Sequence, residues 1–198
     1  MLSITLFPVL IIMLIESDRL RLRQFTYDDL DDIYRIWIDP DVRKYLWDDE
    51  IISKEKAENI LTYCIDFFQE NGFGIWAIIH KQQDELIGFC GFRFLDDTPE
   101  IEIIFGISPT YWRMGLTKEA IKAAIRYGFE EHDFKCIVGL ANIENIASWR
   151  VMEKAGMKYE KRTLYNNQDV VFYSLSRSAW QADNSLYVLR KAIDQAMY

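Results

Sequence analysis

Two carboxylates stand at alternate positions of one apolar segment, where they are well placed for proton transfer. Glu100 and Glu102 open the run EIEIIFGI at residues 100–107. Alternate residues of a strand project from the same face of a sheet, so a strand over this segment places both carboxylates together. A carboxylate beside a reacting group can accept a proton from it. Both residues are therefore candidates for a functional site, and a surface strand carboxylate is the alternative interpretation for Glu102.

A glycine before a helical pattern is the second feature that could do chemistry. Gly115 is followed by apolar residues that recur at helical spacing over residues 116–130. The first-turn amides of such a helix are unpaired and lie at the positive end of its dipole, so they can bind an anion. A pyrophosphate bound there would bring the rest of an extended ligand alongside strand 100–107, near Glu102. An ordinary strand–helix turn is the alternative interpretation.

A third feature lies in the segment NIASWRVMEKAGMKYE at residues 145–160. Asn145 and Ser148 stand at the start of another helical pattern, where their polar side chains are natural caps. Gly156 predicts a left-handed end to that helix.

The remaining pattern supplies the elements that must position these residues. Period-two segments predict strands at 18–24, 74–80, 86–94, 100–107, 135–140, 157–164 and 169–176. Helical spacing predicts helices at 26–38, 53–70, 116–130 and 145–155, with a last helix from Ser178 to Met197. Thr26 with Asp29 forms a capping box, Ser53 caps the second helix and Gly72 ends it. This order predicts an α/β fold with a mixed, mostly antiparallel sheet flanked by helices. The glycine motifs of Rossmann and P-loop sites are missing at 107–117, which disfavours mononucleotide binding.

Size and charge restrict the classes of function. The 198 residues fit one domain, and the net charge of −8 disfavours nucleic-acid binding while suiting a cationic partner such as an amine. The basic residues that gather lie on edges expected to be solvated: Arg19, Arg21 and Arg23 on a strand, and Lys118, Lys122 and Arg126 on a helix.

Cysteine and histidine usage favours a reducing compartment without a metal site. Cys64, Cys90 and Cys136 all lie in apolar runs and are expected to be buried thiols in the cytoplasm. His80 and His132 have no second ligand at metal spacing, so no metal site is expected.

The first 15 residues carry no charge, but they lack the positive start of a signal peptide. They are shorter than the ~20 apolar residues that span a bilayer, and Pro8 interrupts them. We expect an apolar extension at 1–14, a domain at 15–180 and a helical extension at 181–198. Met13 is a natural alternative start, and a signal anchor is the alternative interpretation.

Taken together, the chemical segments resemble the GNAT acyltransferases, especially the branch containing the ribosomal-protein N-terminal acetyltransferases. That branch commonly reads E-I-G-Y-W, P-x-Y-W-G-x-G-Y-A-T-E-A and N-x-x-S-x-R-V-x-E-K-x-G-F. The matching residues are Glu102-Ile103, Pro109, Tyr111-Trp112, Gly115, Glu119-Ala120, Asn145, Ser148, Val151, Glu153-Lys154 and Gly156. The resemblance covers about residues 15–180.

This resemblance implies direct transfer of the acetyl group of acetyl-CoA to a primary amine, without a covalent enzyme intermediate. An alkylammonium is not nucleophilic, so Glu102, directly or through water, is expected to accept its proton, with Glu100 as the alternative. Asn145 is expected to hydrogen-bond the coenzyme arm, and Ser148 to protonate the departing thiolate. The remaining coenzyme contacts are expected from Phe105, Gly106, Ile107, Arg113, Met114, Gly115, Leu116, Thr117 and Lys118.

Three departures from the family pattern concern the phosphate loop. Arg113 replaces its first glycine, Thr117 a small residue and Lys118 a threonine. Arg113 is expected to present its amide only with a negative φ. All three side chains could themselves meet phosphate oxygens.

Other functions are kept open. The acceptor is a peptide N-terminus or a small-molecule amine, and the aromatic, acidic segment 39–50 could frame it or be a packed surface loop. A non-catalytic acetyl-CoA sensor on the same fold is the main alternative. A membrane-associated adaptor is a third hypothesis, although membrane binding is not expected. A homodimer is compatible with the sequence.

Overall fold

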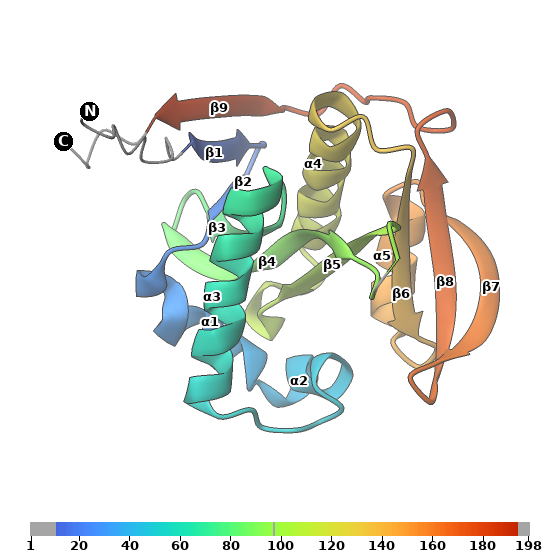
Figure 1. Cartoon of the computed structure of the whole chain (residues 1–198), viewed down its shortest axis with the longest axis horizontal. Coiled ribbons are helices and arrows are strands. Elements are labelled where there is room, and N and C mark those ends of the chain that lie inside the picture. The colour runs from blue at the N-terminus through green and yellow to red at the C-terminus, as the bar shows by residue number, and fades with distance from the viewer. Residues whose placement is uncertain (1–10, 97, 194–198) are drawn as a thin grey trace, which may run out of the picture.

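The computed structural model describes residues 11–96 and 98–193, and its strands form one sheet with helices on both faces (Figure 1). The strands are β1 (Ile11–Glu16), β2 (Leu20–Gln24), β3 (Ile75–His80), β4 (Glu85–Phe94), β5 (Ile101–Ile107), β6 (Cys136–Asn142), β7 (Lys158–Tyr165), β8 (Gln168–Ser176) and β9 (Val188–Ile193). The helices are α1 (Leu30–Trp37), α2 (Pro40–Leu46), α3 (Lys54–Asn71), α4 (Leu116–Glu131) and α5 (Ile146–Lys154), with 3₁₀ turns η1 (Tyr27–Asp29) and η2 (Pro109–Tyr111).

The strand order is β7-β8-β6-β5-β4-β3-β2-β1-β9. Neighbouring strands run antiparallel except β5 and β6, which are parallel. At the β7–β8 turn, Asn166 and Asn167 have φ values of 47° and 63°, as a two-residue hairpin turn requires. The mixed, mostly antiparallel sheet confirms the predicted fold class.

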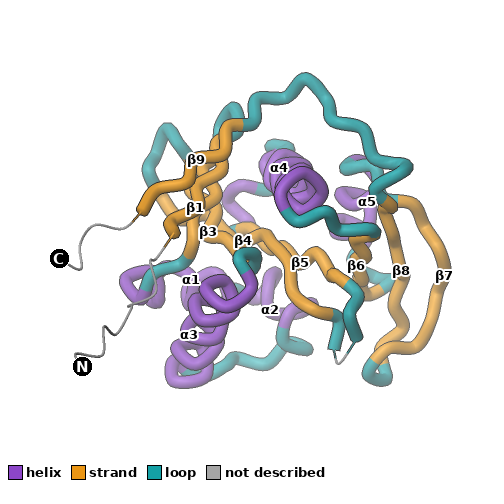
Figure 2. The backbone as a smooth tube through the Cα atoms, turned by 45° about the horizontal axis from the view of Figure 1, so that its top comes forward, coloured by secondary structure: helices purple, strands orange, loops and turns teal. Residues whose placement is uncertain are grey.

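Helix α4 covers one face of the sheet and helices α1 and α3 cover the other (Figure 2). Each face has its own apolar core. On one face, α4 buries Ile121 and Ala124 in the cluster that holds Trp76 and Phe92. On the other face, α1 and α3 bury residues such as Leu61 in the second cluster. Burial of these apolar stripes fixes the helices on the two faces of the sheet.

Local capping agrees with the sequence in the first half of the chain. Thr26 and Asp29 form the predicted capping box, and the Ser53 hydroxyl accepts a hydrogen bond from the Lys56 amide at 3.1 Å. Gly72 ends α3 with a φ of 73°.

One helix was not predicted. Segment 39–50 contains α2, because Pro40 starts a helix rather than only ending the previous one. The Asp39 carboxylate caps it by accepting from the Asp41 amide at 3.0 Å.

The helix predicted over Ser178–Met197 is wrong within the described residues. Residues 188–193 form β9 instead, which pairs with β1 from Ile11 opposite Ile193 to Glu16 opposite Val188. The edge of β1 offers a continuous row of backbone partners, and this pairing outweighs the weak helical spacing of the tail. Residues 194–198 of that predicted helix lie outside the described residues.

The segment expected to be an N-terminal extension contributes to the same sheet. Its residues 11–14 belong to β1, which continues to Glu16 and pairs with β2, while residues 1–10 lie outside the described residues. Met13, the alternative start, lies within β1.

Two of the three cysteines are buried as predicted. Cys64 and Cys90 are enclosed, and burial raises the pKa of the Cys64 thiol to about 12. Cys136 is exposed, and its predicted burial is wrong. It is the first residue of β6, so its side chain lies outside the core in which the next residue, Ile137, is enclosed.

Candidate active site

Strands β5 and β6 pair at one end and then separate. Their parallel register is limited to Ile101 opposite Ile137 and Glu102 opposite Val138, whereas β5 pairs with β4 along its whole length. The chain beyond β5 leads to the N-terminus of α4, and the chain beyond β6 leads to the N-terminus of α5. Two helix N-termini therefore follow the separated ends of two parallel strands, the position at which open α/β sheets bind ligands.

The backbone of β5 turns alternate residues toward this separation. Ser108 donates its amide to the Ile87 carbonyl at 2.8 Å, and the antiparallel alternation then turns the backbone groups of Gly106 toward β4. Those of Phe105 and Ile107 face the opposite side, from which β6 has separated. Phe105, Gly106 and Ile107 were all predicted to contact the coenzyme, but the backbone groups of Gly106 face β4 and not the open side of the strand. A Cβ at Gly106 would lie 2.6 Å from the Phe89 ring, so this glycine is explained by packing.

The predicted phosphate loop lies between η2 and α4. Trp112 anchors it by donating its indole N–H to the Ile107 carbonyl at 2.9 Å. Gly115 is the N-cap of α4 with a φ of 77°, and no side chain caps the first turn. Leu116 is buried in the core, while Met114 and Lys118 are exposed and Thr117 is half-buried. The first-turn amides of α4 thus lie beside exposed and half-buried side chains.

Arg113 differs from the expectation. Its φ is 63°, so the predicted negative value is wrong, and the residue occupies the left-handed region that glycine adopts without penalty. For a residue with a Cβ this conformation costs roughly 1–2 kcal/mol. Contacts around the loop must offset that cost.

The two candidate bases differ in environment. Glu102 is 4% exposed and accepts a hydrogen bond from Arg93 Nε at 2.6 Å. Burial raises the pKa of the Glu102 carboxyl, although the Arg93 guanidinium acts to lower it. Glu100 is exposed and precedes β5. Burial and the ion pair therefore distinguish Glu102 from its neighbour.

Asn145 and Ser148 meet at the start of α5. The Asn145 side-chain carbonyl accepts the Ser148 amide at 3.2 Å, which confirms the predicted cap. Both residues are half-buried at the end of β6 that has separated from β5. This bond uses the Asn145 carbonyl and the Ser148 amide, so the Asn145 NH₂ group and the Ser148 hydroxyl are available for other contacts.

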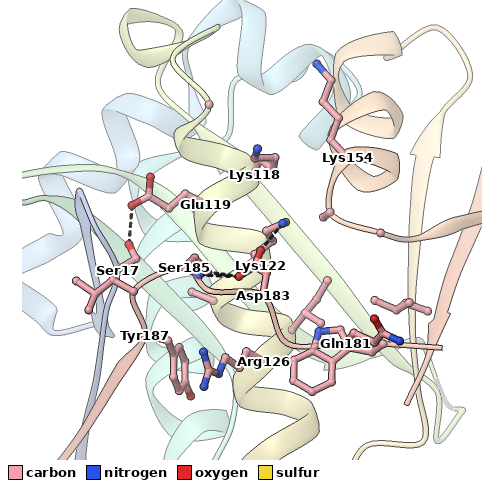
Figure 3. A pocket seen from close by; sticks show the side chains of 18 of the residues that line it. Ser17, Lys118, Glu119, Lys122, Arg126, Lys154, Gln181, Asp183, Ser185 and Tyr187 are labelled. Atoms are coloured by element: carbon pink, nitrogen blue, oxygen red, sulfur yellow. Dashed lines mark hydrogen bonds and ion pairs between the residues drawn. The ribbon is translucent and has the colours of Figure 1, made fainter. Parts of the chain in front are cut away.

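A cavity of about 460 Å³ lies along α4 beneath the segment that leads to β9 (Figure 3). Gly115 and Lys118 are the predicted coenzyme residues that line it. Lys122 and Arg126, expected on a solvated edge, also line it. Lys122 donates to the Asp183 carboxylate at 2.5 Å. Sequence reasoning missed this contribution of the C-terminal segment because it assigned that segment to a helix.

Contacts on the opposite side of Glu102 join distant segments. The Tyr165 hydroxyl at the end of β7 donates to the Asp96 carboxylate at 2.5 Å. Burial, and then the Asp96 carboxylate, raise the pKa of Tyr165 to about 12, with a further contribution from the charge of Glu102. Gln168 donates to Asp48, which connects the β7–β8 hairpin to the segment after α2. These contacts join the β7–β8 hairpin to the segments that follow α2 and β4.

Within residues 11–96 and 98–193, no group of three or more histidine, cysteine or acidic side chains is arranged to hold a metal ion. The helices of the same residues include none with the length and apolar content needed to cross a bilayer.

The family model described as an acetyltransferase (GNAT) domain matches residues 19–158. The chain belongs to the GNAT acetyltransferase family. Among GNAT relatives, the uncharacterized N-acetyltransferase YoaA of Bacillus subtilis is 31% identical over 166 residues, which cover 82% of this chain and 91% of YoaA. The uncharacterized N-acetyltransferase p20 of Bacillus licheniformis is 28% identical, over 73% of this chain and 82% of p20.

Solved structures agree with this GNAT assignment. A GNAT-family acetyltransferase from Bacillus anthracis superposes with a TM-score of 0.72 at 26% identity, covering 83% of this chain and 99% of that one. The ribosomal L7/L12 α-N-protein acetyltransferase RimL, in complex with coenzyme A, has a TM-score of 0.71 at 18% identity, over 82% of this chain and 97% of its own, and so shares the fold. The GNAT chain described here is an acetyl-CoA-dependent acyltransferase.

Proposed function

We propose that this acetyltransferase transfers the acetyl group directly to a primary amine, with Glu102 as the general base. The buried Glu102 carboxylate on β5, at the point where β6 separates from it, carries this proposal. Glu102 accepts a proton from the incoming ammonium, directly or through water, which frees the nitrogen lone pair. The nitrogen then bonds to the thioester carbonyl carbon as the carbon–sulfur bond breaks. The product nitrogen then releases its second proton to water, the thiolate takes a proton from the Ser148 hydroxyl, and water returns a proton to the serine, while Glu102 gives its proton to solvent before the next turnover.

Backbone groups hold the acetyl donor in this proposal. The amides of Phe105 and Ile107 lie on the open side of β5 and suit the acyl carbonyl and the pantetheine arm. The uncapped first turn of α4, from Gly115 onward, suits the pyrophosphate. The Asn145 NH₂ group donates to the arm from the other side of the separation.

Burial favours Glu102 over Glu100 as the base. A raised carboxyl pKa lies closer to neutral pH and makes proton acceptance more effective. Glu100 is exposed and precedes the strand. Arg93 keeps the ionised form of Glu102 accessible despite its burial.

The acceptor approaches, in this proposal, between the β7–β8 hairpin and the segment after α2. Asp48, Asp96 and Tyr165 border that side, and acidic groups favour a cationic amine. A protein N-terminus and a small-molecule amine both satisfy this requirement.

A non-catalytic acetyl-CoA sensor is the alternative function, favoured by the strained Arg113 in the phosphate loop. A sensor would bind the coenzyme without turnover. The retained Glu102 and Ser148 favour catalysis instead.

Thiol release from acetyl-CoA, measured over N-terminal peptides, polyamines and aminoglycosides, tests the proposal. We expect turnover with one group of acceptors and a ~10²–10⁴-fold lower kcat for Glu102→Gln, with little change in coenzyme affinity. Glu100→Gln is the matched control and should retain activity. Full activity of Glu102→Gln would remove Glu102 from the mechanism. Calorimetric binding of acetyl-CoA without turnover on any acceptor would favour the sensor.

A further inference from the structure

The phosphate loop contains two left-handed residues within three positions. Arg113 has a φ of 63° and Gly115 a φ of 77°. The family pattern has a glycine where this chain has Arg113, and glycine tolerates such a conformation without strain. Something else in this chain must therefore hold the loop in place.

Arg19, at the turn between β1 and β2, contacts the loop and the helix after it. Its Nη1 donates to the Met114 carbonyl at 2.8 Å, between the two left-handed residues. Its Nε and Nη2 lie 2.8 and 2.7 Å from Oε2 of Glu119 in the first turn of α4. One planar guanidinium therefore bridges the loop backbone and the helix that follows it.

Glu119 is itself firmly held. Its Oε1 accepts the Arg19 backbone amide at 2.8 Å and the Ser17 hydroxyl at 2.8 Å, the latter drawn in Figure 3. Burial acts to raise the pKa of the Glu119 carboxyl, but these bonds and the Arg19 guanidinium hold it below its ordinary value. The carboxylate is thus ionised and gives Arg19 a fixed anchor.

The same charge would oppose coenzyme binding if it were left alone. An ionised carboxylate in the first turn of α4 lies near the amides that suit a phosphate, and like charges repel. Arg19 neutralises Glu119 at that point while it holds the loop carbonyl.

We propose that Arg19 is a positioning residue that holds the Arg113–Gly115 loop in its coenzyme-binding conformation, in a chain that has Arg113 where the family pattern has a glycine. This inference rests on the proposed binding of acetyl-CoA at the α4 N-terminus. Arg19 touches the loop backbone and Glu119, so it acts through the loop.

Calorimetry with coenzyme A and steady-state kinetics test this role. In Arg19→Met we expect coenzyme affinity to fall about tenfold or more, and the KM for acetyl-CoA to rise with kcat largely retained, because a hydrogen bond to a charged group is lost. Arg21→Met is the matched control, since Arg21 pairs with Asp84 away from the loop. Wild-type affinity in Arg19→Met would overturn the proposal.

Rescue separates positioning from general destabilisation. In the Arg113→Gly background the loop takes its left-handed conformation without strain, so Arg19→Met should weaken coenzyme binding much less. An equal loss in both backgrounds would overturn the proposal. If Arg19→Met fails to fold, Arg19→Lys takes its place in these measurements. Lysine keeps the charge but cannot bridge both partners, so Arg19→Lys should also weaken coenzyme binding.

Amide hydrogen exchange without coenzyme makes the test independent of the proposed function. Amides 113–117 should exchange faster in Arg19→Met than in the wild type, while those of β3 stay unchanged. Unchanged exchange at 113–117 would overturn the role of Arg19. If the wild type binds no coenzyme but amides 113–117 still exchange faster in Arg19→Met than in the wild type, the proposed function is contradicted while the role of Arg19 in holding the loop is supported.

Discussion

Arg93 and Glu102 are direct partners across the β4–β5 ladder, and Nε of the arginine lies 2.6 Å from Oε2 of the glutamate. Their shared register puts both side chains on the same face of the sheet. Glu102 is almost fully enclosed, whereas Arg93 reaches solvent, so the charge of one stabilises the charge of the other at the boundary of the core. This pair couples the protonation of the proposed base to the neighbouring Arg93 guanidinium.

The activity of the enzyme should depend on pH through the ionisation of Glu102. The base form of Glu102 is the ionised one, so kcat/KM should rise with pH through the pKa of this carboxyl, which burial raises and Arg93 lowers. Removing Arg93 leaves burial unopposed, so Arg93→Met should move this rise to higher pH. Arg35→Met, at an exposed helical position, is the control. An unshifted profile would separate Arg93 from the chemistry.

Gly115→Trp should abolish coenzyme binding, because the side chain would fill the space over the first turn of α4 and the residue would be strained at a φ of 77°. Gly115→Asn is the matched variant, since asparagine tolerates the left-handed region and is small. Calorimetry should show a much smaller loss of affinity for Gly115→Asn. Normal binding by Gly115→Trp would mean that the phosphates bind elsewhere.

Tyr165→Phe should raise the KM for the acceptor about two- to tenfold and leave the KM for acetyl-CoA unchanged. The variant loses the bond to Asp96 that joins β7 to the turn before β5. Tyr159→Phe, at an exposed position on the same strand, is the control. A change confined to the KM for acetyl-CoA would contradict this division of the site.

Asp29→Asn should lower the free energy of unfolding by about 1–3 kcal/mol, a range that allows for solvent screening of the partly exposed Arg23. Asp29 is buried and receives both Arg23 Nη groups, at 2.7 and 2.6 Å, and the Thr26 amide at 2.8 Å. Burial acts to raise its pKa, but these bonds hold the pKa below its ordinary value.

Because the pKa of Asp29 is lowered in the folded protein, its contribution to the free energy of unfolding depends on pH. A depressed folded-state pKa gives stability that is present above the unfolded pKa of about 3.9 and is lost as the pH falls through the folded value. Denaturant unfolding should therefore show the difference between wild type and Asp29→Asn at pH 7, and a smaller one below about pH 4. An equal difference at both pH values would contradict the ionic origin.

Much of the fold was predictable because it depends on local patterns. The β-rich run of β5, the helical spacing of α4 and the caps at Ser53 and Asn145 are short-range features, and the structure agrees with each of them. The β7–β8 hairpin was predictable for the same reason, since paired asparagines suit its turn.

The remaining features depend on partners distant in the sequence. Strand β9 forms because β1 lies beside it, and no pattern within residues 188–193 indicates that pairing. The Met114 carbonyl, next to the left-handed Arg113, accepts a hydrogen bond from Arg19, which lies 95 positions earlier in the sequence. The Arg93–Glu102 pair follows from the β4–β5 register, which was not assigned from the sequence. The sequence could therefore indicate candidate site residues by type and spacing, but not the long-range contacts that surround them in the structure.

The pairing of β1 with β9 also has a mechanical consequence. Ile11 lies opposite Ile193 and Glu16 opposite Val188, so the outer ends of both strands are at the same end of the ladder. A force that pulls Ile11 and Ile193 apart would unzip this ladder one residue pair at a time instead of shearing it as a unit. This ladder would open at a small pulling force, while strands β2–β8, including the separated ends of β5 and β6, keep their arrangement. Single-molecule extension should then record a small early release of chain before the main unfolding event.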